Sequence, residues 1–133
     1  MITVKTIINA PILKVWEYWT KPEHIKNWNF ASDDWHCPKA VNNLKIGGKF
    51  IYTMASKDGE MSFDFSGNYI NLKEFSLIEY ALIDGRKVII LFEVQDNNVV
   101  ITESFDPENE NLEELQKNGW QNILNNFKKY TEQ

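Results

Sequence analysis

The N-terminal part of the chain changes from alternating to helical spacing of its apolar residues. Residues 2–7 have the period-two pattern of a first strand. Asn9-Ala10-Pro11 follows, and this segment predicts a helix that Asn9 or Ala10 caps and whose first turn holds Pro11. A second short helix is predicted over residues 22–25. The apolar face of the first helix consists of Ile12, Val15, Trp16 and Trp19.

The segment from Pro22 to Pro38 holds three large aromatic residues, Trp28, Phe30 and Trp35, and beyond the short helix it has no periodicity. Exposing such rings would forgo a burial energy of about 1.5–3 kcal/mol each. We therefore expect an aromatic loop from Asn27 to Pro38 that covers the core or gates the mouth of a pocket.

From Leu44 to Phe105 the apolar positions alternate, and turn signals interrupt them. Asp-Gly between two alternating runs is a strong hairpin signal, because the tight turn needs a positive φ. Several consecutive hairpins predict an antiparallel meander. The turn segments are Gly47-Gly48, Asp58-Gly59, Asn71–Glu74, Asp84-Gly85 and Asp96–Asn98.

A long helix is predicted from about Asn109, its cap, to Tyr130, after Pro107 has ended the sheet. Glutamates lie near its start and Lys128-Lys129 near its end, as the helix dipole favours. Gly119 costs about 1 kcal/mol within a helix relative to alanine, which close packing or space for a ligand would offset. The apolar stripe consists of Leu112, Leu115, Trp120, Ile123, Leu124, Phe127 and Tyr130.

The order of elements predicts an α+β fold in a single domain, residues 1–133. A curved antiparallel sheet of about six to seven strands would wrap around the long C-terminal helix, with two short helices after the first strand. A helix and a concave sheet rarely match along their whole length, so we expect a cavity between them.

Composition narrows the classes of partner. The net charge of −5 argues against nucleic acid and against anionic membrane surfaces. Cys37 is the single cysteine, so no intrachain disulfide can form, which suits a reducing compartment. No apolar run reaches the ~20 residues of a membrane span, and no signal segment is evident. We therefore expect a soluble, cytoplasmic protein without membrane insertion.

Aromatic residues make up 14% of the chain, and five of them are tryptophan. These rings either line a pocket for an apolar ligand or form the core itself. The hydroxyls of Tyr52, Tyr69 and Tyr80 either orient the polar end of a ligand or lie at the rim of the core. The residues that we expect to line the cavity are Trp28, Trp35, Phe50, Tyr52, Phe63, Phe65, Tyr80, Phe92, Trp120 and Leu124.

Candidate catalytic carboxylates lie on the strands. Asp64 lies between Phe63 and Phe65, so it faces solvent if those rings face the core, and it enters the pocket if the register is reversed. Glu93 and Glu103 have the same ambiguity, and we expect all three carboxylates to face solvent. No Ser-His-Asp set, phosphate loop or dinucleotide motif is present. The sequence thus favours a protein without catalysis or cofactor.

A metal site is not expected. Asp33, Asp34, His36 and Cys37 form a tempting group, but the chain has no second pair with zinc spacing, and His24 is the only other histidine. Cys37 is better interpreted as a small buried residue than as a nucleophile, because His36 and Cys37 should point apart on an extended segment.

The whole chain resembles the SRPBCC superfamily, whose helix-grip fold is shared by START domains, the birch-pollen allergen group and polyketide cyclases. More narrowly, it is similar to the bacterial branch related to the C-terminal domain of the activator of the ninety-kilodalton heat-shock protein's ATPase. The matching blocks are NAPILKVWEYWTKPEHIKNWNFASDDWHCP, IGGKF, FDFSGNY, DGRKV and ELQKNGWQNILNNFKKY.

The resemblance implies binding of a small hydrophobic or amphipathic molecule between the sheet and the terminal helix. It also leaves open an interaction module for the chaperone, which is disfavoured because the chain has no counterpart of the eukaryotic activator's N-terminal domain. A cyclase or hydrolase acting on aromatic or polyketide-like substrates is the third class. A homodimer through an edge strand or the aromatic loop is compatible with the sequence.

Overall fold

The computed structural model describes all residues from Met1 to Gln133, and it confirms the predicted α+β helix-grip fold. Seven antiparallel strands form one sheet with the order β1-β7-β6-β5-β4-β3-β2. The strands are β1 (Ile2–Ile8), β2 (Trp35–Asn42), β3 (Lys49–Ser56), β4 (Ser62–Lys73), β5 (Leu77–Leu82), β6 (Lys87–Gln95) and β7 (Asn98–Phe105). The helices are α1 (Ile12–Thr20), α2 (Pro22–Ile25) and α3 (Glu113–Thr131).

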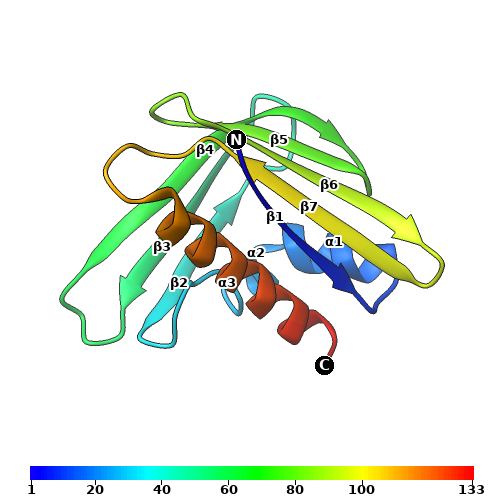
Figure 1. Cartoon of the computed structure of the whole chain (residues 1–133), viewed down its shortest axis with the longest axis horizontal. Coiled ribbons are helices and arrows are strands. Elements are labelled where there is room, and N and C mark those ends of the chain that lie inside the picture. The colour runs from blue at the N-terminus through cyan, green and yellow to red at the C-terminus, as the bar shows by residue number, and fades with distance from the viewer.

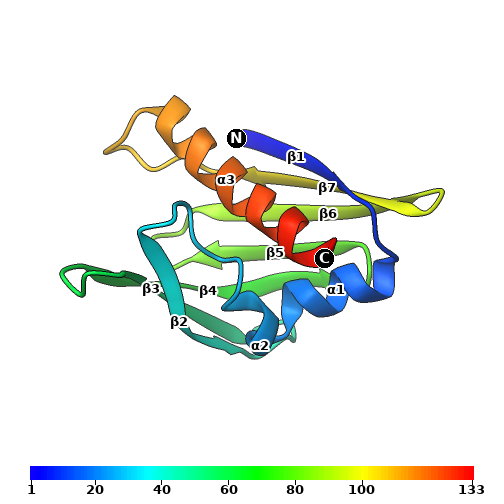
Figure 2. The ribbon, with the colours of Figure 1, turned by 90° about the horizontal axis from the view of Figure 1, so that it is seen from below.

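The sheet curves around α3, which runs diagonally across its concave face (Figure 1). Seen from below, α1 and α2 lie on the same side of the sheet as α3 (Figure 2). The main contacts of α3 with the sheet are with β1. Gln121 Nε2 donates to the Lys5 carbonyl at 3.3 Å, and Lys128 Nζ donates to the Ile7 carbonyl at 2.5 Å. These bonds cover polar backbone groups on the outer edge of the sheet.

The last part of the expected aromatic loop is in fact a strand. Residues 35–42 pair with β3, starting from Trp35 opposite Ser56. The sequence hides this strand because Pro38 interrupts it and the register shifts between His36 and Lys39. A proline and a bulge are tolerated on an edge strand, and both discourage pairing with a further strand. The aromatic loop is therefore shorter than predicted.

The start of α3 also differs from the prediction. Leu112 rather than Asn109 precedes the first helical residue, and Leu112 and Leu115 are 72% and 60% exposed, outside the buried stripe. Gln116 holds the preceding segment in a non-helical form. Its Nε2 donates to the carbonyls of Glu108 and Asn111 at 3.0 and 2.9 Å, and its Oε1 accepts from Glu108 N at 2.9 Å.

One turn falls later than predicted. β4 continues to Lys73, so Asn71–Lys73 belong to the strand, and the turn that follows contains Phe75 at φ 69°. A bulky residue at positive φ is rare, and no Gly or Asn signals this turn in the sequence.

Aromatic rings form the centre of the core. Trp19 contacts Trp28 at 4.9 Å and Phe127 at 4.8 Å between ring centroids, and Trp28 contacts Phe127 at 4.9 Å. Trp16 meets Phe92 edge-on at 5.2 Å. These offset and T-shaped contacts join α1, the loop after α2, the sheet and α3.

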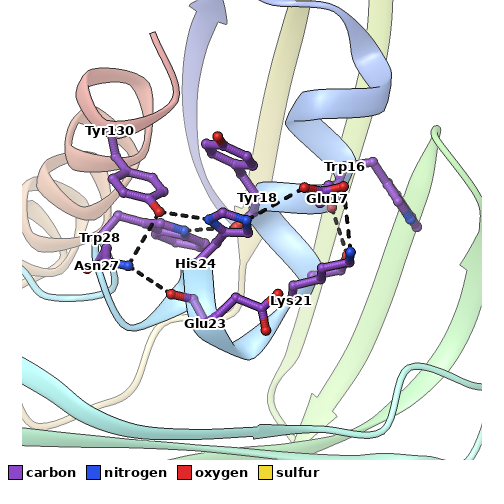
Figure 3. A network of polar contacts seen from close by, with 10 residues as sticks. Trp16, Glu17, Tyr18, Lys21, Glu23, His24, Asn27, Trp28 and Tyr130 are labelled. Carbon is purple, nitrogen blue, oxygen red and sulfur yellow. Dashed lines mark hydrogen bonds and ion pairs between the residues drawn. The ribbon is translucent and has the colours of Figure 1, made fainter. Parts of the chain in front are cut away.

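The corner between α1 and α2 is fastened to the end of α3 by polar contacts (Figure 3). The hydroxyl of Tyr130 is hydrogen-bonded to His24 Nδ1 at 2.7 Å, and it accepts from Asn27 Nδ2 at 3.4 Å. Tyr18 stacks on the His24 ring at 3.9 Å, and its carbonyl accepts from Trp28 Nε1 at 3.0 Å. The first part of the aromatic loop is therefore held in place on two sides.

None of the helices is long and apolar enough to cross a membrane.

Gly119 is not explained by close packing, because a Cβ built there meets no atom within 4 Å. We expect Gly119→Ala to raise the free energy of unfolding by up to about 1 kcal/mol, through restriction of the unfolded chain and better helix propensity. Urea unfolding measures this change. Gly67→Ala is the contrasting variant, since its Cβ would lie 2.5 Å from the Ala81 carbonyl oxygen and should destabilise the protein. A loss of stability in Gly119→Ala would contradict the prediction.

Candidate functional site

A cavity of about 450 Å³ lies between the concave face of the sheet, the aromatic loop and α3. Its volume is within the range of small-molecule sites. Twenty-two residues line the cavity, and 15 of them are hydrophobic. The sheet supplies residues from β2 to β7, the loop supplies residues 28–32, and α3 supplies Gln116, Trp120 and Ile123. Apolar walls with a few polar groups are typical of a ligand site.

The structure places most, but not all, of the expected lining residues in the wall. Trp28, Trp35, Tyr52, Phe63, Phe65, Tyr80 and Trp120 lie there. Phe50, Phe92 and Leu124 do not, and their assignment is corrected to the core, where they are 1%, 3% and 0% exposed. Phe50 packs behind the wall against Tyr80 at 4.7 Å, and Phe92 packs against Trp16 and Trp19.

Trp120 forms part of the wall and contacts two rings of the sheet, of which Phe65 also lies in the wall. It stacks on Phe105 with 4.0 Å between centroids and an angle of 10°, and it meets Phe65 edge-on at 5.9 Å. At the mouth, Trp35 lies 5.8 Å from Phe63, which is 54% exposed. Aromatic side chains therefore line the cavity from its interior to its mouth.

The aromatic loop contributes more residues than its rings alone. Asn29, Phe30, Ala31 and Ser32 also lie in the wall. Asn126 Nδ2 of α3 donates to the Phe30 carbonyl at 2.7 Å, so the loop and the helix are joined beside the cavity. The sequence predicts that this loop lies at the cavity, but it does not show which of these four side chains line the wall.

Three tyrosines provide hydroxyl groups in the wall. Burial raises the pKa of Tyr52 and of Tyr80 well above the usual value, and it raises the pKa of Tyr69 to about 12. All three are therefore neutral at physiological pH. The Tyr69 hydroxyl donates to Asn42 Oδ1 at 2.5 Å, and Asn42 Nδ2 donates to the Thr20 carbonyl at 2.7 Å, so this ring is fixed in orientation.

Glu103 contradicts the expectation of a solvent-facing carboxylate. It is 6% exposed and lies in the cavity wall. On β7 it shares the inward face with Ile101 and Phe105, and its partners across the sheet are Val4 and Ile90, both fully buried. The sequence carried this signal, since period two from Ile101 and Phe105 puts Glu103 on the apolar face.

The carboxyl group of Glu103 makes no hydrogen bond within the protein. Thr131 Oγ1 is the only fully enclosed side-chain oxygen or nitrogen without a partner, so the oxygens of Glu103 are reached from the cavity. Burial raises the pKa of Glu103 to about 8, and no neighbouring charge contributes to this shift. The carboxyl is thus largely protonated at pH 7.

The other two candidate carboxylates are exposed, as expected. Asp64 accepts a hydrogen bond from Thr53 Oγ1 at 2.8 Å on the outer face of the sheet, and Glu93 is also on the outside. Glu103 is therefore the one strand carboxylate among the three that can act within the cavity.

The histidine and cysteine near the loop do not form a reactive pair. His36 is exposed whereas Cys37 is buried, on alternate sides of β2. Burial also raises the pKa of the Cys37 thiol, which disfavours the nucleophilic thiolate. No group of three or more metal-ligating side chains gathers anywhere in the structure.

Because the pKa of Glu103 is raised in the folded state, the neutral carboxyl stabilises the fold fully below about pH 4.5, and this contribution is lost as the pH rises through about 8. We expect Glu103→Gln to remove this loss. At pH 8 the free energy of unfolding of the variant should exceed that of the wild type by roughly a few kcal/mol, whereas at pH 4.5 it should not. Urea unfolding at the two pH values measures the difference. Glu93→Gln, on the outer face, is the control, and an equal response of both variants would contradict the assignment.

Comparison with known proteins places this geometry in a family. Residues 9–132 match the family described as Activator of Hsp90 ATPase homolog 1-like protein. The solution structure of the AHSA1-like protein from Aeromonas hydrophila is similar with a TM-score of 0.90 and 35% identity, over 98% of this chain and 92% of that one. No functionally curated protein matches the sequence.

Two further structures support the same fold. A protein from Cytophaga hutchinsonii is 56% identical with a TM-score of 0.86, over 98% of this chain and 91% of that one. A protein from Nitrosomonas europaea, at 17% identity, shares the fold with a TM-score of 0.82, over 97% of this chain and 92% of that one. By its sequence and by its structure, the chain belongs to the AHSA1-like family of the SRPBCC superfamily.

Proposed function

We propose that the protein binds a small hydrophobic or amphipathic molecule in the cavity between its sheet and α3. The observation that carries the proposal is the cavity itself, with a volume of about 450 Å³ and 15 hydrophobic residues among the 22 that line it. Burial of apolar area supplies the affinity at such a site, and a few polar groups orient the ligand.

The wall has the parts that such a binder needs. The rings of Trp28, Phe65 and Trp120 offer flat apolar surface, and they are held by ring contacts with the core. The polar groups of Asn29, Tyr80 and Glu103 are few and lie among these rings. A preformed wall reduces the ordering cost of binding.

A second candidate function is proton transfer to or from a bound substrate, which Glu103 favours. A carboxyl with a pKa of about 8, reached from an apolar cavity, can donate a proton to a substrate oxygen or accept one from carbon. Tyr80, whose hydroxyl is affected by the charge on Glu103, would lie beside the reacting atoms. A cyclase-like reaction is the class of chemistry that fits these groups.

The neutral fluorescent probe N-phenyl-1-naphthylamine tests the binding function in solution. We expect Trp120→Ala to weaken its binding by at least about tenfold, because one wall of the cavity is lost. The stability of this variant should fall by only about 1–2 kcal/mol, since the ring is half-buried and stacks on Phe105 alone over its full face.

Trp16→Ala is the matched control, because Trp16 is 7% exposed and lies in the core rather than in the cavity wall. It should cost about 3–5 kcal/mol of stability and leave the affinity of the remaining folded protein nearly unchanged. Fluorescence titration and urea unfolding of both variants decide the matter. If Trp120→Ala cost as much stability as Trp16→Ala and did not affect binding, the site would be refuted.

A further inference from the structure

Glu103 is an acidic group that has no positively charged partner in the protein. Its side chain is buried among Val4, Ile90 and Phe105, it accepts no hydrogen bond, and its oxygens are reached from the cavity. Arg86 is the single basic residue of the cavity wall, and its Nε is already 2.7 Å from Asp84 Oδ2. Any positive partner for Glu103 must therefore come from outside the chain.

The rest of the wall also favours a cation. The faces of tryptophan, tyrosine and phenylalanine rings attract cations, and such rings dominate this wall. Its other acidic residue, Glu108, lies in the segment before α3, where its Oε1 accepts from Asn111 N at 2.8 Å. An anionic ligand would meet Glu108 and a single basic group that is already engaged with Asp84, so its charge would be poorly matched.

We infer that the cavity takes a cationic amphipath, a molecule with an apolar ring body and one protonated amine that pairs with the carboxylate of Glu103. The inference rests on the proposed function and names the chemical class of its ligand. The ring body occupies the space between Phe65, Trp120 and the aromatic loop, and the amine lies against β7.

Binding of this kind has a defined proton balance. The carboxyl of Glu103 releases its proton to solvent, the ligand amine keeps its own, and an ion pair forms. Since the pKa of Glu103 is about 8 in the free protein, about 0.9 protons should be released per ligand bound at pH 7. An alkyl amine, like that of lysine, stays protonated to about pH 10.

The tyrosines that face Glu103 cannot release a proton in this pH range. Tyr52 of β3, Tyr69 of β4 and Tyr80 of β5 have raised pKa values and stay neutral below pH 9. Arg86, between β5 and β6, is the one basic residue of the lining, and its Nε lies 2.7 Å from Asp84 Oδ2. The residues that α3 contributes to the wall are not titratable, and Glu108 is the one further acid of the lining.

Two probes of equal shape test the inference, 2-(2-naphthyl)ethylamine and 2-(2-naphthyl)ethanol. Isothermal titration calorimetry from pH 6 to pH 9, in two buffers of different ionisation enthalpy, gives affinity and proton release. We expect the affinity for the amine to rise about tenfold per pH unit below pH 8 and then to level off. The affinity for the alcohol should stay nearly constant, and at pH 8.5 the amine should bind at least about tenfold more tightly than the alcohol.

Glu103→Gln should abolish both the pH dependence and the preference for the amine, whereas binding of the alcohol should persist. Glu93→Gln, on the outer face, should behave as the wild type. Equal binding of the two probes would overturn the inference but leave the proposed function intact, and no binding of either at millimolar concentration would contradict both. A third outcome would also refute the inference. If the ketone 2-acetonaphthone bound more weakly above pH 8, and the amine bound no more tightly than the alcohol, Glu103 would act as a proton donor to the ligand.

Discussion

The packing of α3 against the β1 side of the sheet is the constraint on which the rest of the structure depends. Gln121 and Lys128 bind the carbonyls of Lys5 and Ile7 there. On the same helix Leu124 and Phe127 are fully buried in the core, and the Phe127 ring contacts Trp19 and Trp28. A straight helix that is fixed to one side of a curved sheet leaves much of the opposite side uncovered, and Trp120 reaches from it to Phe65 of β4. The concave surface of β3, β4 and β5 is therefore left to the aromatic loop and to the rings of the cavity wall.

Glu103 lies near the end of the cavity where helix and sheet meet. Its strand, β7, is paired with β1, and Phe105, two residues farther along, stacks on Trp120 of α3. A leucine or valine at position 103 would continue the apolar face of the strand, as Ile101 and Phe105 do on either side. Burying a carboxyl there instead costs stability above about pH 4.5, and such local costs are concentrated at functional sites.

The regular parts of the fold could be predicted from the sequence because one pattern governs each of them. Alternation with Asp-Gly turns specified the meander, and the spacing from Trp120 to Tyr130 specified the buried face of α3. The exceptions are places where tertiary contacts replace local signals. Gln116 holds residues before α3 out of the helix, Pro38 and a bulge disguise β2, and Phe75 turns the chain at a positive φ.

The candidate site, too, could be predicted from the sequence only in part. Large rings at strand and loop positions indicate a cavity, but periodicity does not tell Phe50 and Phe92, which pack behind the wall, from Tyr52 and Phe65 within it. That distinction depends on where α3 leaves the sheet, which is a property of the assembled fold. Unlike the places of Phe50 and Phe92, the inward position of Glu103 follows from the alternation of the strand alone. The general rule that carboxylates face water predicts the opposite position. When a strand pattern and a residue preference disagree in this manner, the pattern reflects the geometry of the backbone, and the unexpected residue is the one whose chemistry needs an explanation.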